Sequence, residues 1–121
     1  MMARLIDFET YVDNRGSLSV IDKVVPFQIK RVFYIYNVDG SKRGYHKHKK
    51  TIQLAFCITG SCDIYIKKNN KLKKFSMNKS NFGLLLEPND FHWMENFSKD
   101  AILVVLASEN FNPDDYIYDE K

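Results

Sequence analysis

The 121-residue chain lacks any apolar run close to the roughly 20 residues that a membrane-spanning helix requires, so we expect no membrane segment. Its start, MMARLIDFETYVDNRG, lacks the apolar core of a signal peptide, which predicts a cytoplasmic protein. No segment repeats apolar residues with the period of an amphipathic helix, and there is no internal repeat or linker. These absences predict one soluble domain, residues 1–121, in which helices play little part.

Cysteine and net charge are also scarce. Cys57 and Cys62 flank a predicted turn, but a cytoplasmic location keeps thiols reduced, so we expect no disulfide. The net charge of +3 is too small to predict nucleic-acid binding. Lysines of residues 67–74 are expected at the solvated tip of a hairpin turning at Asn69-Asn70, whereas the basic residues between 42 and 50 surround two histidines.

Short strand-like segments account for most of the chain. They are rich in aromatic and β-branched residues and are separated by turn signals such as Asp13–Gly16. A last helical turn is expected at Asn112–Asp114. The predicted strands are residues 4–9, 18–22, 30–38, 51–59, 62–67, 71–77, 82–86, 91–96 and 101–107. Nine strands with no long helix predict an all-β sandwich or barrel.

Two motifs carry the histidines. His46 and His48 are one residue apart and precede Gln53, and His92 follows the Gly83–Pro88 region. The spacing resembles the two motifs of the cupin superfamily, which implies a cupin-type jelly-roll β-barrel. Metal-binding cupins have a glutamate in the first motif where this chain has Gln53. The loss of that carboxylate, together with the nearby basic residues, predicts that no metal is bound.

Proton transfer is the chemistry that we expect from the histidines. Imidazole accepts and donates protons near neutral pH. The alternative is that His46 and His48 are exposed loop residues in a basic segment. A placement of both on one face of a strand, with Arg43 nearby and His92 on another strand, favours a functional site.

A closer resemblance covers the chain from about Asp13 to Tyr118. The motifs RGSL (15–18), IKRVFYI (29–35), RGYHKHKK (43–50), TGSC (59–62), VLAS (105–108) and DDYI (114–117) are similar to those of sugar-nucleotide 3,4-ketoisomerases. That family isomerises dTDP-4-keto-6-deoxyglucose to a 3-keto sugar on the way to 3-amino-3,6-dideoxyhexoses of surface glycans such as the O-antigen of lipopolysaccharide. The resemblance implies an isomerase that needs no cofactor.

The resemblance also implies roles for individual residues. The family motif falls on Arg43, His46 and His48, and its pocket tyrosine falls on Tyr34, with Tyr36 on the same strand face as the alternative. We expect His48 to be the base at carbon 3 and His46 to move or support a proton between the sugar oxygens. Tyr34 would stabilise or protonate the oxyanion, and Arg43 would add positive charge.

Other residues are candidates for substrate contacts. Arg15 and Arg31 would bind the diphosphate, or else form surface or intersubunit ion pairs. Gln53 and His92 are expected to line the barrel. Of the two products, galacto at carbon 4 is favoured over gluco by overall similarity.

Relatives of this fold dimerise by exchanging N-terminal strands, so the resemblance implies a homodimer in which residues 4–9 and 18–22 cross between subunits. Three rival functions stay open. They are a dTDP-sugar 3,5-epimerase, which pairs its histidine with an aspartate in a differently spaced motif, a non-catalytic sugar-nucleotide sensor, and a metal-dependent cupin enzyme. Deuterium incorporation separates the first two from a ketoisomerase, and elemental analysis tests the third.

Overall fold

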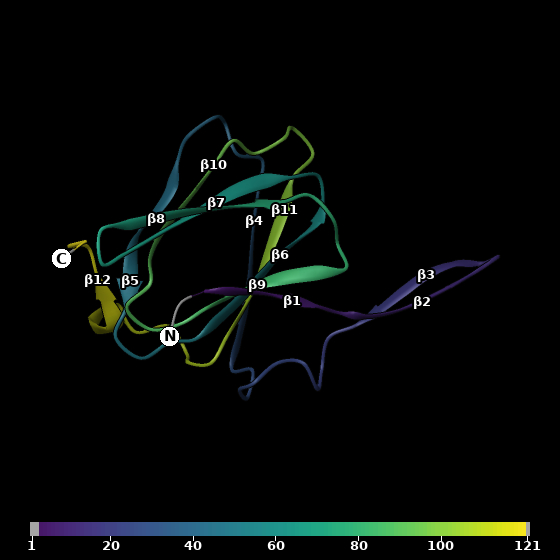
Figure 1. Cartoon of the computed structure of the whole chain (residues 1–121), viewed down its shortest axis with the longest axis horizontal. Helices are drawn as coiled ribbons and strands as arrows, with labels where there is room; N and C mark the ends of the chain where they lie inside the picture. Colours follow the sequence, from purple (N-terminus) through teal and green to yellow (C-terminus); the bar gives the residue numbers. More distant parts are fainter. Residues whose placement is uncertain (1–2, 121) are drawn as a thin grey trace.

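The computed structural model describes residues 3–120 and consists of two facing β-sheets with a hairpin that projects beyond them (Figure 1). The strands are β1 (Arg4–Asp7), β2 (Glu9–Asp13), β3 (Gly16–Val20), β4 (Arg31–Tyr36), β5 (Arg43–His48), β6 (Gln53–Thr59), β7 (Cys62–Lys68), β8 (Lys71–Met77), β9 (Phe82–Leu86), β10 (Phe91–Glu95), β11 (Ile102–Ala107) and β12 (Tyr116–Ile117), with one 3₁₀ turn, η1 (Pro113–Asp115).

Each main sheet has five antiparallel strands. The first has the order β1-β9-β6-β11-β4, and the second has the order β12-β5-β10-β7-β8. Consecutive strands therefore often lie in different sheets, and chain-distant strands such as β5 and β10 become neighbours. The arrangement confirms the predicted all-β, cupin-type architecture. Among residues 3–120, no helix is long and apolar enough to cross a membrane.

Alternating side chains build two apolar clusters. The first lies between the sheets and includes Ile64, Leu84 and Leu103, all fully buried. The second lies on the outer face of the first sheet, where residues such as Phe8 and Val25 cover it. Because both faces of β6 and β11 are buried, their sequences are continuously apolar. The packing on both faces also stabilises the first sheet, which forms one wall of the space between the sheets.

All nine predicted segments contain strand, and three further strands were not among them: β2, β5 and β12. The Asn69-Asn70 turn is confirmed, with both residues at positive φ (54° and 64°) between β7 and β8. The predicted helical turn is η1, where the Asn112 side chain accepts a hydrogen bond from the Asp114 amide.

The two cysteines face each other across the turn between β6 and β7. Cys57 and Cys62 are buried, free thiols whose sulfur atoms lie 3.7 Å apart. At that distance they pack as small apolar side chains of the core between the sheets.

Candidate active site

A cavity of about 190 Å³ lies between the two sheets. The second sheet contributes Arg43, Gly44, His46, Ile64, His92, Met94 and Tyr116 to its wall, and the first sheet contributes Phe33, Ile35, Gln53, Ala55, Leu86, Leu103 and Val105. Every titratable group among these lining residues therefore belongs to one wall. The opposite wall is apolar except for Gln53.

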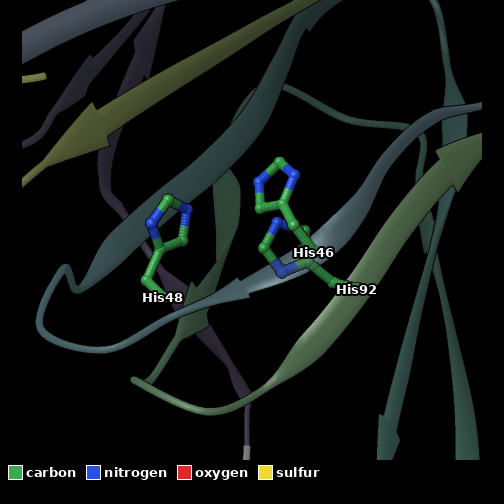
Figure 2. A group of neighbouring side chains, drawn as sticks. All are labelled: His46, His48 and His92. Atoms are coloured by element: carbon green, nitrogen blue, oxygen red, sulfur yellow. The ribbon is translucent and has the colours of Figure 1, made fainter. Parts of the chain in front are cut away.

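Three imidazoles come together at this wall from two neighbouring strands (Figure 2). His46 and His48 lie on β5, His92 lies on β10, and one ring nitrogen of each lies within 4.8 Å of the others. The His46 ring packs edge-on against those of His48 and His92, at centroid distances of 5.0 and 4.9 Å. His46 and His92 line the cavity, whereas His48, only 3% exposed, is in the cluster but not among the lining residues.

A β-bulge in β5 brings Arg43 to the same cavity as His46. Strict alternation would place these two side chains on opposite faces of the strand, because their positions differ by an odd number. Pairing with β10 shifts register here, and both Gly44 (φ 99°) and Tyr45 (φ 61°) have left-handed backbone conformations. The Tyr45 ring is stacked on Trp93 at 5.2 Å, which holds the bulge against β10.

Hydrogen bonds fix two of the imidazoles. The Asp115 carboxylate accepts bonds from His48 Nδ1 (3.0 Å), from the Thr51 hydroxyl and from the Lys50 amide (2.8 Å). His92 Nδ1 donates to the carbonyl oxygen of Asp90 at 3.0 Å. With Nδ1 protonated in both rings, Nε2 is the basic nitrogen of each. Within the described residues, Nε2 of His48 is buried and has no hydrogen-bond partner.

Burial keeps the three imidazoles neutral at physiological pH. It lowers the pKa of His46 to about 4 and that of His92 to about 3, and the neighbouring His48 acts in the same direction on both. Burial also lowers the pKa of His48, although the Asp115 carboxylate partly opposes this shift. For Asp115, burial raises the pKa, but the hydrogen bonds from Thr51, His48 and the Lys50 amide outweigh it and lower it overall.

The same cluster is a candidate site for a divalent metal. Its three imidazoles are suitable donors, but Gln53 is uncharged and no carboxylate is among the residues that line the described cavity. Arg43 adds positive charge to the wall. This donor set fits a divalent cation poorly, so no step of the chemistry below is derived through a metal.

The structure places both predicted pocket tyrosines on the outside of the first sheet. Tyr34 and Tyr36 are 60% and 55% exposed and stack on each other at 5.4 Å. Phe33 and Ile35 occupy the face of β4 that lines the cavity. The expectation that the two tyrosines share a face is confirmed, but that face is turned away from the cavity, so neither reaches it within one chain.

The two candidate arginines lie in different places. Arg15 is at the tip of the β2–β3 hairpin, its side chain 87% exposed and paired with Asp13 at 2.7 Å, and it does not line the cavity. Arg31 lies at the start of β4 with its guanidinium over the rings of Phe33 (5.3 Å) and Phe111 (5.8 Å). Its Nε atom is buried without a hydrogen-bond partner among the described residues, close to a residue of the cavity wall.

Sequence reasoning missed two functional residues of the C-terminal segment. Asp115 forms the carboxylate–imidazole pair with His48, and Tyr116 lines the cavity with its ring against His46 and His48 at 4.9 and 4.5 Å. The DDYI motif contained both, but only as a sign of resemblance. An aspartate paired with histidine was also expected to mark the epimerases, and its presence here removes that distinction.

Known proteins match this chain over most of its length. Residues 1–121 match the family model described as FdtA: WxcM-like, C-terminal. A curated TDP-4-oxo-6-deoxy-alpha-D-glucose-3,4-oxoisomerase from Aneurinibacillus thermoaerophilus is 38% identical over 120 residues, covering 97% of this chain and 86% of the relative.

Solved structures agree with these matches. A mutant of the 3,4-ketoisomerase QdtA from Thermoanaerobacterium thermosaccharolyticum, in complex with TDP-4-keto-6-deoxyglucose, is 38% identical with a TM-score of 0.93, covering 97% of this chain and 87% of its own. A 3,4-ketoisomerase from Helicobacter canadensis is 38% identical with a TM-score of 0.93, covering 98% and 92%. An rmlC epimerase from Mycobacterium tuberculosis, 14% identical with a TM-score of 0.80 and covering 94% and 66%, is similar in fold alone.

Proposed function

Because this chain belongs to the FdtA, WxcM-like family and is a TDP-sugar 3,4-ketoisomerase, we propose that it converts TDP-4-keto-6-deoxy-D-glucose into the 3-keto sugar with galacto configuration at carbon 4. The QdtA relative is described in complex with that 4-keto substrate. The observation that carries the proposal is the one-sided cavity, in which neutral imidazoles line one wall and apolar side chains line the other.

The proton at carbon 3 is acidic enough to remove because the neighbouring ketone delocalises the negative charge as an enediolate. We assign His48 as the base, because Asp115 holds its Nδ1–H and leaves the unpartnered Nε2 within the imidazole cluster. His46, which lines the cavity, moves a proton between the two sugar oxygens or supports that movement. Arg43 adds positive charge where the enediolate forms. His92 and Gln53 hold the sugar in place.

The galacto product follows from proton carriers on one side only. In 4-keto-6-deoxy-D-glucose, a proton taken from carbon 3 and a proton added to carbon 4 from the same face give the galacto arrangement. The gluco arrangement needs a donor on the opposite face. His46, His48 and His92 all belong to the second sheet, and the facing wall presents Phe33, Ala55 and their apolar neighbours.

Overall identity does not separate these products. A relative from Campylobacter jejuni named TDP-fucose-3,4-ketoisomerase is 35% identical to this chain, and another named TDP-quinovose 3,4-ketoisomerase is 38% identical. The proposal of a galacto product therefore rests on the wall geometry. The coupling between H4 and H5 of the product made in ordinary water tests it, since galacto gives a small coupling and gluco a large axial–axial one.

The nucleotide would extend out of the cavity, which at about 190 Å³ is smaller than the roughly 300–1,000 Å³ of pockets that enclose whole drug-sized ligands. Arg31 is the proposed diphosphate contact within the chain, because its guanidinium lies beside the wall residue Phe33. Arg15 lies too far along the projecting hairpin for its own cavity. It remains a proposed contact only to the cavity of a second subunit.

A homodimer with exchanged N-terminal hairpins is the proposed assembly. The hairpin exposes Tyr11, Val12 and Leu18, and such a two-stranded ribbon gains little stability by itself. The outer face of β4 presents Val32 and Tyr34, which a partner would cover.

We place the reaction in the cytoplasm. We also place it on a route to 3-amino-3,6-dideoxyhexoses of surface glycans such as the lipopolysaccharide O-antigen, because aminotransfer at carbon 3 requires a 3-keto sugar.

The decisive experiment is incubation with TDP-4-keto-6-deoxyglucose in deuterated water followed by NMR. Deuterium at carbon 4 together with a 3-keto product supports the proposed isomerisation. Binding without conversion would indicate a sensor, and deuterium at carbon 5 would indicate an epimerase. For the base, His48→Asn should abolish turnover while TDP affinity, measured by calorimetry, stays close to that of the wild type; an active His48→Asn protein would contradict the assignment.

A further inference from the structure

Tyr116 is the hydroxyl-bearing side chain that lines the cavity, and it has no hydroxyl-bearing neighbour among the lining residues of the described chain. Its ring packs against the imidazoles of His46 and His48, with centroid distances of 4.9 and 4.5 Å. Tyr116 also pairs with His48 through the β12–β5 ladder. Its position is therefore tied to the base that we assign.

The segment around Tyr116 is held firmly. The Lys49 amide donates to the Asp115 carbonyl at 2.9 Å, and the Asp115 amide donates to the Asn112 carbonyl at 3.0 Å. The rings of Phe111 and Tyr118 pack on Tyr116 at 5.8 and 6.3 Å. A ring held by these contacts presents its hydroxyl with little loss of side-chain entropy on substrate binding.

The proposed reaction needs a group that gives a proton to oxygen 4, and of the two roles left open for His46 we take the supporting one. As carbon 3 loses its proton, negative charge builds on oxygen 4 and must be met by a donor. The cluster imidazoles are neutral before the reaction, and the proton that His48 takes from carbon 3 is needed at carbon 4, so none of them supplies a proton to this oxygen. A phenol is a stronger acid than the N–H of a neutral imidazole, and its hydroxyl both donates and accepts.

We propose that Tyr116 is a further catalytic residue whose hydroxyl carries a proton between the two sugar oxygens; the inference rests on the proposed isomerisation. In the first half, His48 takes the proton of carbon 3, the carbon 3–carbon 4 double bond forms, and oxygen 4 takes the hydroxyl proton of Tyr116. In the second half, the phenolate takes the proton of oxygen 3 as its carbonyl forms, and His48 returns a proton to carbon 4. Both residues end as they began, and His46 orients the oxygens.

The test compares Tyr116→Phe with Tyr118→Phe. Each substitution removes one hydroxyl and keeps the ring, and Tyr118 is exposed and does not line the cavity. We expect Tyr116→Phe to lower kcat about 10²-fold or more with KM and TDP affinity within about twofold, and Tyr118→Phe to leave all three within about twofold.

Activity of Tyr116→Phe within about fivefold of the wild type would overturn the inference. So would a loss of kcat matched by an equal loss of TDP affinity, because that pattern indicates a packing role. If the wild-type protein leaves TDP-4-keto-6-deoxyglucose unconverted, the proposed function fails and the inference fails with it. If the wild type is active and Tyr116→Phe is equally active, only the inference fails.

Discussion

Acidification from about pH 7.5 to about pH 5 should lower the free energy of unfolding by about 3 kcal/mol. The chain contains three histidines, and all of them lie in the cluster. The pKa values of His46 (about 4) and His92 (about 3) are lowered in the fold, so the unfolded chain binds protons first. Stability is complete above the unfolded value of about 6.5 and is lost as the pH falls below it.

The magnitude follows from the buried rings. A pH of about 5 lies about 1.5 units below the pKa of histidine in the unfolded chain, whereas His92 in the fold is still neutral. This residue alone therefore lowers the free energy of unfolding by about 2 kcal/mol. His46 lies partly open to solvent and contributes about half as much after screening is considered. His48, whose pKa is also lowered, adds to the loss in the same direction.

Urea unfolding followed by the fluorescence of Trp93, the single tryptophan, measures both free energies. His92→Gln has one titrating group fewer, so its loss between the two pH values should shrink to about 1 kcal/mol whatever its stability at neutral pH. A wild-type loss below about 0.5 kcal/mol would refute the argument from burial. So would a loss that His92→Gln leaves unchanged.

Three further outcomes are expected. Asp115→Asn should lower kcat about 10²-fold or more with little change in KM, because the amide no longer holds His48 with Nδ1 protonated, and steady-state kinetics will measure it. Gly44→Ala should cost at least about 1 kcal/mol more than Gly16→Ala in urea unfolding, because both have positive φ but only at Gly44 does a Cβ meet backbone atoms of β10 at 3.1 Å. Val12→Asp should shift the proposed dimer to a monomer in light scattering, and a dimer that Val12→Asp leaves unchanged would contradict the proposed hairpin exchange.

Alternation of apolar and polar residues predicted most strands, because a strand with one buried face carries a period of two. β5 was not predicted, because its sequence, RGYHKH, is basic and its bulge breaks the alternation. For β4, alternation put Tyr34 and Tyr36 on one face but could not say which face was buried, since Phe33 and Ile35 are equally apolar.

The histidine cluster was predictable in part. The spacing of His46 and His48 puts both on one face if their segment is a strand, and His92 fell in the predicted strand of residues 91–96. Asp115 lies 67 positions from His48, and no local pattern links two residues joined only by the return of the chain to β5. Arg15 was correctly predicted to lie in a turn. Whether its hairpin contacts the cavity of a second subunit depends on the proposed dimer, which local sequence patterns do not specify.

The C-terminal segment from Glu109 gives the barrel only a two-residue strand, yet it carries Asp115 and Tyr116. All the strands of both sheets except β12 precede it in the chain. Asp115 and Tyr116 are thus separable at one connection from the strands that carry His46, His48 and His92. A barrel made without this segment and a synthetic peptide that supplies it would form a split enzyme, whose activity reports on whether the two parts have been brought together.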